Sequence, residues 1–371
     1  MSTIVRSPTL ADELTSLVPL ALRGLSRMQD EATGLFAHKS LIRSNGGLTN
    51  RGLNPLYTAA CVIGLLSVPE GRVEPYATQA RRGLDALVRV EHDDPSVLGS
   101  TLWGCVCAGH DEATRLAAAL VAPTDPRRWS SMQLGLALAG LARWLQTGDA
   151  HTDAAARTAR ALATELEERY LPRACVFAGT RIRRQDPFGF TSFASQVYPV
   201  LGLCDLAEAT STVPSAVVGR VCDFLVRSQG EMGQWWWFYS TRAAKVIEGY
   251  PVYSVHQDAM AVMALLSASR FELGDYREAM TTGVRWIWGT NELDRCLVNP
   301  EAGMIYRAIQ RTGGDADGFA GWSHKQRAAA SLAALSNRTH RVPPKLEVLT
   351  ECRPYHLGWL LLAAAMAGAS T

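Results

Sequence analysis

Apolar residues recur at helical spacing along almost the whole chain, with Gly, Pro and Asp at the breaks, and strand-like alternation is scarce. Two segments, 177–189 and 289–304, lack a helical period and are expected to be irregular. The pattern predicts helices over 10–28, 54–67, 74–90, 96–108, 110–122, 130–146, 150–169, 190–209, 214–229, 253–270, 275–289, 322–337 and 353–369.

These helices are of two kinds. One kind is amphipathic, with Arg, Glu and Asp on one side, as in 74–90 and 150–169. The other kind is apolar nearly all round and rich in small residues, which indicates burial on both sides. Its six members alternate with the first kind: "PLYTAACVIGLLS", "SVLGSTLWGCVCAG", "SMQLGLALAGLARWL", "SFASQVYPVLGLCDLA", "VHQDAMAVMALLSA" and "YHLGWLLLAAAMAG".

The alternation predicts an all-α fold, an (α/α)6 toroid in which an inner ring of apolar helices is wrapped by an outer ring. We expect one domain over residues 1–371. An open superhelix of helical hairpins is the alternative, but it would bury both sides of six helices less well.

Composition and charge agree with a globular protein that has a large core. The chain has 371 residues, 47% hydrophobic and 19% charged, with a net charge of +2. The Lys and Arg residues are scattered, so no nucleic-acid partner is expected. Asp12 and Glu13 interrupt any leader-like pattern, which favours a cytoplasmic protein. The eight cysteines are expected to be buried free thiols. The apolar run from Leu357 is short for a membrane span, although peripheral membrane contact stays open.

Polar residues lie at the N-terminal ends of all six apolar helices. Each alone is explained by capping or by a satisfied core polar group, but their repetition at one end of a ring indicates a shared functional cavity. The residues are Asn54 and Tyr57; Ser100, Thr101 and Trp103; Ser130, Ser131 and Gln133; Thr191, Ser192 and Gln196; His256, Gln257 and Asp258; and Arg353, Tyr355 and His356.

Asp258 is the first catalytic candidate. It stands at the entrance to a buried helix, where burial disfavours the charged carboxylate and suits a general acid. A carboxylate that satisfies helix N-terminal amides is the alternative. His256 would either tune Asp258, be the acid itself, or be structural. Tyr253, three residues earlier, would face the same way.

Aromatic and charged residues supply the candidates for substrate binding. The run Trp235, Trp236, Trp237 and Tyr239 would stabilise a cation or stack on a sugar ring, or else fill a hydrophobic plug. The other expected binding residues are Trp103, Gln196, Gln257, Glu292, Arg307, Arg353 and Tyr355.

Glu351 would form a structural ion pair with Arg353, or the two would clamp an anionic group. Asp315 and Asp317 lie on a Gly-rich loop, but their spacing is incomplete for a calcium loop. The chain also lacks phosphate-loop, zinc-protease and nucleophile-elbow motifs, so no metal and no cofactor are predicted.

One segment resembles a known family. "QGEMGQW" (229–235) fits Q-x-x-x-G-x-W and resembles the QW motif of squalene-hopene-type terpenoid cyclases, whose pattern is similar in related prenyltransferase toroids. "GQWWWF" is then followed by "GYPVYSVHQDAMAVMALL", in the order of the cyclase segments G-G-W-x-F and Y-P-D-x-D-D-T-A.

The resemblance implies an α/α toroid in which an aspartic acid protonates an isoprenoid alkene or epoxide and aromatic walls hold the carbocation. It covers only residues 229–266 and includes one QW motif, where full-length triterpene cyclases have several. The D-x-D-D cluster is not intact, and Asp258 aligns with one of its aspartates.

Three functions follow, in this order of preference. The first is a terpenoid-cyclase-like enzyme with Asp258 as proton donor and a hydrophobic or diphosphate small-molecule substrate. The second is a carbohydrate-active toroid, a hydrolase, lyase or epimerase on an acidic saccharide; hydrolysis would pair Asp258 with Glu292 or Glu351. The third is a non-catalytic toroid that binds a partner or a lipid.

Overall fold

The computed structural model describes residues 8–43, 47–122, 125–148, 152–181, 189–313 and 345–369. The expected helix 322–337 and the loop with Asp315 and Asp317 lie outside these residues.

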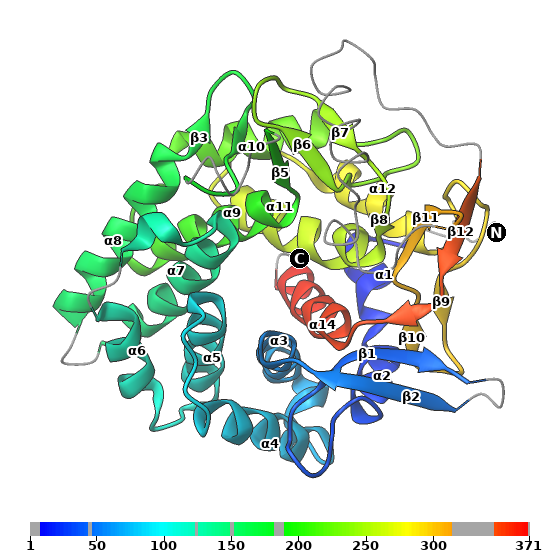
Figure 1. Ribbon diagram of the computed structural model, residues 1–371, viewed down its shortest axis with the longest axis horizontal. Helices are drawn as coiled ribbons and strands as arrows, with labels where there is room; N and C mark the ends of the chain where they lie inside the picture. The colour runs from blue at the N-terminus through cyan, green and yellow to red at the C-terminus, as the bar shows by residue number, and fades with distance from the viewer. Residues whose placement is uncertain are drawn as a thin grey trace, which may run out of the picture.

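Six helices form a closed inner ring (Figure 1). Each packs against the next, and the last, near the C-terminus, packs against the first, so the ring closes. They are the six apolar helices of the sequence, and the predicted (α/α)6 toroid is confirmed. The ring consists of α3 (Pro55–Ser67), α5 (Pro95–Ala108), α7 (Ser131–Leu145), α9 (Ala194–Ala209), α11 (Ala261–Ser269) with the π-helical turn η3 (His256–Met260) before it, and α14 (Pro354–Gly368).

The amphipathic helices surround this ring (Figure 1). The N-terminal pair packs on α14, so the beginning of the chain covers the end of the chain. The outer helices are α1 (Leu10–Thr15), α2 (Val18–Ser26), α4 (Tyr76–Val88), α6 (Ala113–Val121), α8 (Thr152–Glu168), α10 (Ala216–Arg227) and α12 (Arg277–Ile287).

Glycines let the inner helices touch backbone to backbone. A Cβ on Gly140 of α7 would lie 2.2 Å from the carbonyl oxygen of Gly99 on α5, and one on Gly64 of α3 would lie 2.1 Å from that of Gly358 on α14. Such contact requires residues without a side chain, which explains the small residues of the apolar helices.

Short antiparallel strands precede most of the inner helices, and the sequence pattern did not predict them. Three sheets have the orders β13-β1-β2, β12-β11-β8 and β5-β6-β7, and two hairpins pair β3 with β4 and β9 with β10. Their bounds are β1 (Ala37–Ile42), β2 (Leu48–Leu53), β3 (Tyr170–Leu171), β4 (Val176–Phe177), β5 (Phe190–Ser192), β6 (Phe238–Ser240), β7 (Val246–Glu248), β8 (Val252–Tyr253), β9 (Val298–Asn299), β10 (Met304–Ile305), β11 (Ala308–Arg311), β12 (Leu346–Leu349) and β13 (Glu351–Cys352).

Several predicted helix boundaries are therefore wrong. The helix expected from 190 begins at Ala194 because Thr191 pairs with Tyr239, and the one expected from 253 begins as η3 because Tyr253 pairs with Ala308. The helix expected over 10–28 is split into α1 and α2, and the one expected over 110–122 begins only at Ala113. Two 3-10 turns, η1 (Pro69–Arg72) and η2 (Pro126–Arg128), lie in connections.

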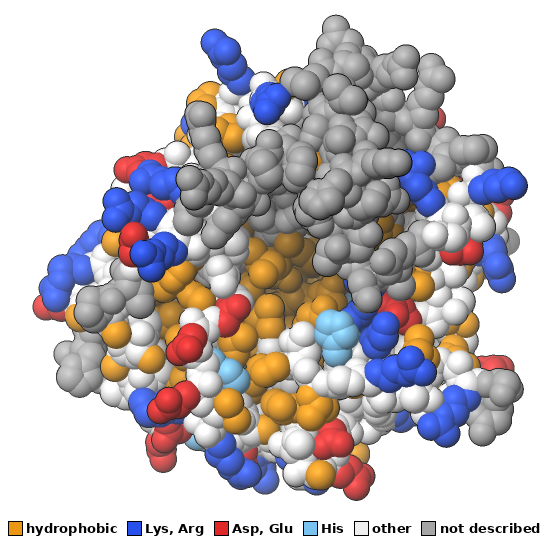
Figure 2. Space-filling view, in the orientation of Figure 1, with side chains coloured by type: hydrophobic (Ala, Val, Ile, Leu, Met, Phe, Trp, Pro, Cys, Tyr) orange, Lys and Arg blue, Asp and Glu red, His pale blue; other side chains and the backbone are white. Residues whose placement is uncertain are grey.

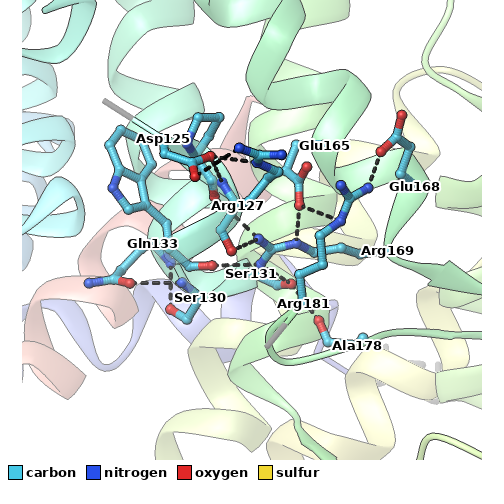
Figure 3. Close-up of polar contacts among 12 residues, drawn as sticks. Asp125, Arg127, Ser130, Ser131, Gln133, Glu165, Glu168, Arg169, Ala178 and Arg181 are labelled. Carbon is cyan, nitrogen blue, oxygen red and sulfur yellow. Dashed lines mark hydrogen bonds and ion pairs between the residues drawn. The ribbon is translucent and has the colours of Figure 1, made fainter. Parts of the chain in front are cut away.

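A buried arginine fastens the start of α7 (Figure 3). Arg169, 2% exposed, donates from Nε to Glu165 Oε1 at 2.8 Å and from Nη1 to the carbonyl of Trp129 at 2.7 Å. The backbone N–H of Ser131 donates to the carbonyl of Gly179 at 2.9 Å. The buried charge is thus fully engaged, and the turn before α7 is fixed against the segment that follows β4.

Two further expectations concern a membrane span and the cysteines. No helix of the described residues is long and apolar enough to cross a membrane. All eight cysteines are free thiols, five of them buried; Cys107 and Cys175 are half-buried and Cys296 is exposed, which corrects the expectation that all are buried.

Candidate functional site

Four strands, β2, β5, β8 and β13, lead directly into inner helices and so lie at the N-terminal ends of these helices, an end of the ring that we call the mouth. In the view of Figure 2 the centre of the ring is hollowed, and hydrophobic side chains line the hollow. The polar residues of the first turns of α3, η3 and α14 therefore stand at the rim of an apolar space.

A charged cluster around Glu351 lies at this mouth. The Glu351 carboxylate, 2% exposed, accepts from Arg307 and from Arg353, whose Nη2 lies 2.9 Å from Oε1. Lys39 Nζ lies 3.6 Å from the other carboxylate oxygen. Burial opposes the negative charge, but the hydrogen bond and positive charge of Arg307, together with Arg353 and Lys39, lower the pKa of Glu351. The described residues thus bring three cationic side chains to one carboxylate.

Tyrosines adjoin this cluster. The guanidinium of Arg307 lies 5.1 Å from the ring centre of Tyr253. The rings of Tyr57 on α3 and Tyr355 on α14 are 4.3 Å apart, and both are half-buried. Burial raises the pKa of all three phenols, so each stays protonated and able to donate a hydrogen bond.

His38 on β1 completes the rim and was missed by the sequence analysis. Its ring stacks on Tyr57 with 5.3 Å between centres and 8° between planes, and its Nδ1 lies 3.2 Å from the side-chain nitrogen of Asn54. Burial, followed by the charges of Arg353, Arg307 and Lys39, lowers the pKa of His38. The segment "AHKSLI" lacks regular apolar–polar alternation, so no periodic pattern marks His38 in the sequence.

Asp258 is fully buried on η3 and is bound by a histidine of α14. Nε2 of His356 lies 2.7 Å and 2.9 Å from the two carboxylate oxygens. His256 was expected to tune Asp258, to be the acid itself or to be structural, but the ring that contacts Asp258 is that of His356. Because Nε2 faces the carboxylate, it carries the proton in the neutral ring, and Nδ1 has the free lone pair.

His256 has a different environment. It is 5% exposed and packs on Phe193, with ring centres 4.5 Å apart, and against Tyr253, at 5.2 Å. Burial, with smaller effects of His356 and Arg307, lowers the pKa of His256 to about 3. Its Nδ1 is buried without a hydrogen-bond partner among the described residues. A ring that stays neutral at ordinary pH is an unsuitable proton donor in its imidazolium form.

Of the aromatic run, one member reaches the candidate site. Trp237 meets Tyr253 edge to face, with 5.7 Å between ring centres. Trp235 and Tyr239 are completely buried, and Trp236 donates from its indole nitrogen to the carbonyl of Ser228 at 2.7 Å. The alternative of a hydrophobic plug therefore describes the positions of these three better.

The two expected glutamines hold extended segments against the ring. Gln196 accepts from the backbone N–H of Phe177 at 2.7 Å and returns a bond to its carbonyl at 3.1 Å. Gln257 accepts from the backbone N–H of Trp235 at 3.0 Å. Both side chains are completely buried, so their amides serve backbone groups of the mouth.

The remaining two candidates lie in other surroundings. Glu292 accepts from Gln234 at 3.0 Å, from the Tyr250 hydroxyl at 2.6 Å and from the Trp286 indole at 2.9 Å. Trp103 lies about two turns into α5, 2% exposed, with the Arg143 guanidinium 5.1 Å from its ring centre. The contacts of both differ from those of the cluster around Glu351. Within the described part of the chain, no group of three or more His, Cys, Asp or Glu side chains could hold a metal ion.

Comparison with known proteins gives similarity of fold only. No known protein family and no curated protein matches the chain in sequence. A solved structure described as a possible member of family GH105 from Klebsiella pneumoniae has a TM-score of 0.61 at 10% identity, covering 100% of this chain and 97% of the other. A structure of a UGL variant with dGlcA-Glc-Rha-Glc has a TM-score of 0.61 at 15% identity, covering 94% and 95%.

A type II terpene cyclase from Scytonema is also similar, with a TM-score of 0.53 at 11% identity, covering 97% and 98%. Other similar structures include a family 88 glycosyl hydrolase, a polysaccharide lyase and a sugar epimerase. The fold is thus that of α/α toroid enzymes, and carbohydrate-active enzymes predominate among the similar structures.

Proposed function

We propose that the protein is a carbohydrate-active enzyme that acts on an acidic saccharide at the mouth of the ring. The observation that carries the proposal is the cluster around Glu351, where Arg307, Arg353 and Lys39 adjoin half-buried tyrosines. Guanidinium groups match a carboxylate in shape and charge, and aromatic rings and phenols suit a sugar with many hydroxyls. The substrate class that was second in the sequence analysis is therefore preferred here.

The contacts of the carboxylates favour proton abstraction over hydrolysis. A hydrolase needs one carboxyl that protonates the leaving group and a second that acts as a base or nucleophile. Glu351 is held by cations, both oxygens of Asp258 face His356, and Glu292 accepts three hydrogen bonds. A lyase or an epimerase instead needs a base, an acid and positive charge beside the substrate's carboxyl group.

The residues supply these three parts. His356, held by Asp258, would take the proton from the carbon next to the substrate carboxyl through Nδ1. Arg307 would stabilise the charge that develops on that carboxyl. In a lyase, the phenol of Tyr253 would give its proton to the departing sugar oxygen as the carbon–oxygen bond breaks. In an epimerase, the same phenol would return a proton to the opposite face of the carbon.

An acid-initiated isoprenoid cyclase is the second candidate. The hydrophobic walls of the hollow and the terpene cyclase among the similar structures support it. Asp258 would be the proton donor and the cations would meet a diphosphate. The pairing of Asp258 with His356 supports it less, because the whole carboxylate is engaged and buried.

The test is incubation of the protein with oligogalacturonates in D2O, followed by NMR and by ultraviolet absorbance of unsaturated products. An epimerase should incorporate deuterium at the carbon next to the carboxyl. A lyase should instead give an unsaturated product, in which that carbon carries no hydrogen. His356→Gln and Tyr253→Phe should remove this activity, and Arg285→Gln, an exposed arginine on the outer helix α12, should leave it unchanged.

Two results would contradict the proposal. Hydrolysis without deuterium exchange would assign the carboxylates to a glycosidase. In parallel, the protein is incubated with geranyl, farnesyl and geranylgeranyl diphosphates and squalene, and the products are analysed by mass spectrometry. Conversion of these compounds alone, abolished by Asp258→Asn, would favour the cyclase.

A further inference from the structure

The hairpin of β1 and β2 presents a row of cations on one face. Lys39 and Arg51 are directly opposite each other in the register, and Arg43 follows Lys39 by four residues. Because side chains alternate along a strand, Lys39, Leu41, Thr49 and Arg51 share a face. Arg43, directly after β1, joins this face because its Nε donates to Thr49 Oγ1 at 2.5 Å. Like charges directly opposite destabilise an antiparallel pair, so the pairing of Lys39 with Arg51 does not itself stabilise the hairpin.

This row continues the charged cluster of the mouth. Leu41 is opposite Glu351 in the register of β1 and β13, so Glu351 shares the face of Lys39, and Lys39 contacts its carboxylate at 3.6 Å. Arg43 and Arg51 lie farther out and are exposed. No hydrogen bond or ion pair joins the Arg51 side chain to another described residue. Figure 2 shows Lys and Arg side chains gathered beside the hollow, on the side where Figure 1 places β1 and β2.

We propose that this hairpin binds an extended acidic oligosaccharide outside the mouth, with Arg43 and Arg51 contacting carboxylates of sugars beyond the reacting one. The inference rests on the proposed function and adds to it that the substrate is an oligomer. Four residues of strand from Lys39 to Arg43 span about 13 Å, which is longer than a single sugar ring. Each cation along this distance can meet a different sugar.

The same face argues against a nucleic acid as the occupant. Single-stranded nucleic acids need aromatic side chains on which bases stack, beside the cations that follow the backbone. The strands "AHKSLI" and "LTNRGL" contain no Phe, Trp or Tyr, and their histidine, His38, is stacked on Tyr57. The charge row without stacking surfaces suits a chain whose charges are carboxylates on sugar rings.

The experiment measures binding and turnover of oligogalacturonates with two to eight sugars. The double variant Arg43→Gln/Arg51→Gln is compared with Arg157→Gln/Arg160→Gln, which removes two exposed charges from the outer helix α8 on the other side of the ring. We expect the hairpin variant to bind the longer oligomers about tenfold more weakly and the shortest one unchanged. The α8 variant should match the native protein throughout.

Binding and turnover separate the two proposals. Length-dependent binding that the hairpin variant loses, without turnover by any protein, would support the hairpin site and refute the proposed function. Turnover with equal affinities in both variants would support the function and refute the hairpin site. A third result would overturn the choice of partner. The native protein would bind a single-stranded DNA oligonucleotide as tightly as the longer oligogalacturonates, and the hairpin variant would lose this binding too.

Discussion

Replacing Asp205 by Asn should stabilise the protein at neutral pH. Asp205 lies on α9, 3% exposed, and its Oδ1 accepts from Arg143 Nη2 at 2.8 Å, while its Oδ2 is buried without a partner among the described residues. Burial, opposed by Arg143 and supported by Glu208, raises the pKa of Asp205 from 3.8 to about 6. A shift of about two pKa units means that the folded protein disfavours the ionised form of Asp205, relative to the protonated form, by about 3 kcal/mol.

The sign follows from proton linkage. The folded protein binds the proton of Asp205 more tightly than the unfolded chain does. The stability that this proton contributes is therefore complete below pH 3.8 and is lost as pH rises through about 6. Asn imitates the protonated carboxyl. Asp205→Asn should therefore raise the free energy of unfolding at pH 7 by up to about 3 kcal/mol and leave it almost unchanged below pH 4.

Urea unfolding at pH 4 and pH 7 measures this difference in the free energy of unfolding. In thermal unfolding at pH 7, the melting temperature of the variant should rise by about 4 °C for a chain of this length. Glu167→Gln, the same kind of change at an exposed site on the outer helix α8, is the control and should alter stability by less than about 0.5 kcal/mol. A lower stability of Asp205→Asn at pH 7 would refute the reasoning, because it would mean that the ion pair with Arg143 outweighs the cost of burying the carboxylate. A difference that is equal at both pH values would refute the linkage.

Two further substitutions test the packing of the ring. Gly140→Ala should destabilise the protein by about 3 kcal/mol or more, because the new Cβ would lie 2.2 Å from the carbonyl oxygen of Gly99. Thermal unfolding measures this loss, and the control is Gly104→Ala, where the nearest atoms to the new Cβ would be 3.4 Å away. Gln229→Ala should cost about 1 to 3 kcal/mol because it removes the two hydrogen bonds to the carbonyls of Gly233 and Ala279, and substrate affinity measured on the folded variant should stay the same.

The architecture could be predicted from the sequence because its cause is local. A helix that is apolar on all sides, with glycines where backbones meet, must be buried on all sides, and six such helices leave few arrangements. The starts of the helices were harder to predict. Thr191 and Tyr253 fit a helical period, but their pairing with Tyr239 and Ala308 makes them strands, and such pairing is invisible in a local window.

The candidate site was only partly predictable for the same reason. Arg307, Arg353 and Tyr355 stand out in the sequence as polar residues near the ends of apolar segments, and the structure gathers them at the mouth. The partner of Asp258 is His356, which is 98 residues away, and only the closure of the ring by α14 brings the two together. Long-range contacts of this kind follow from topology, which periodicity does not give.

The QW-like segment connects neighbouring elements of the toroid. Gln229, at the end of α10, donates to the carbonyls of Gly233 and Ala279 at 3.0 Å and 2.9 Å, which ties α10 to α12. Trp235 is fully buried and its backbone is bound by Gln257 of η3. These contacts are structural, because the amide of Gln229 reaches α12 and Gln257 of η3 binds the backbone of Trp235. In the proposed function the chemistry depends on the mouth, where Asp258 is held by His356 and the sequence departs from D-x-D-D.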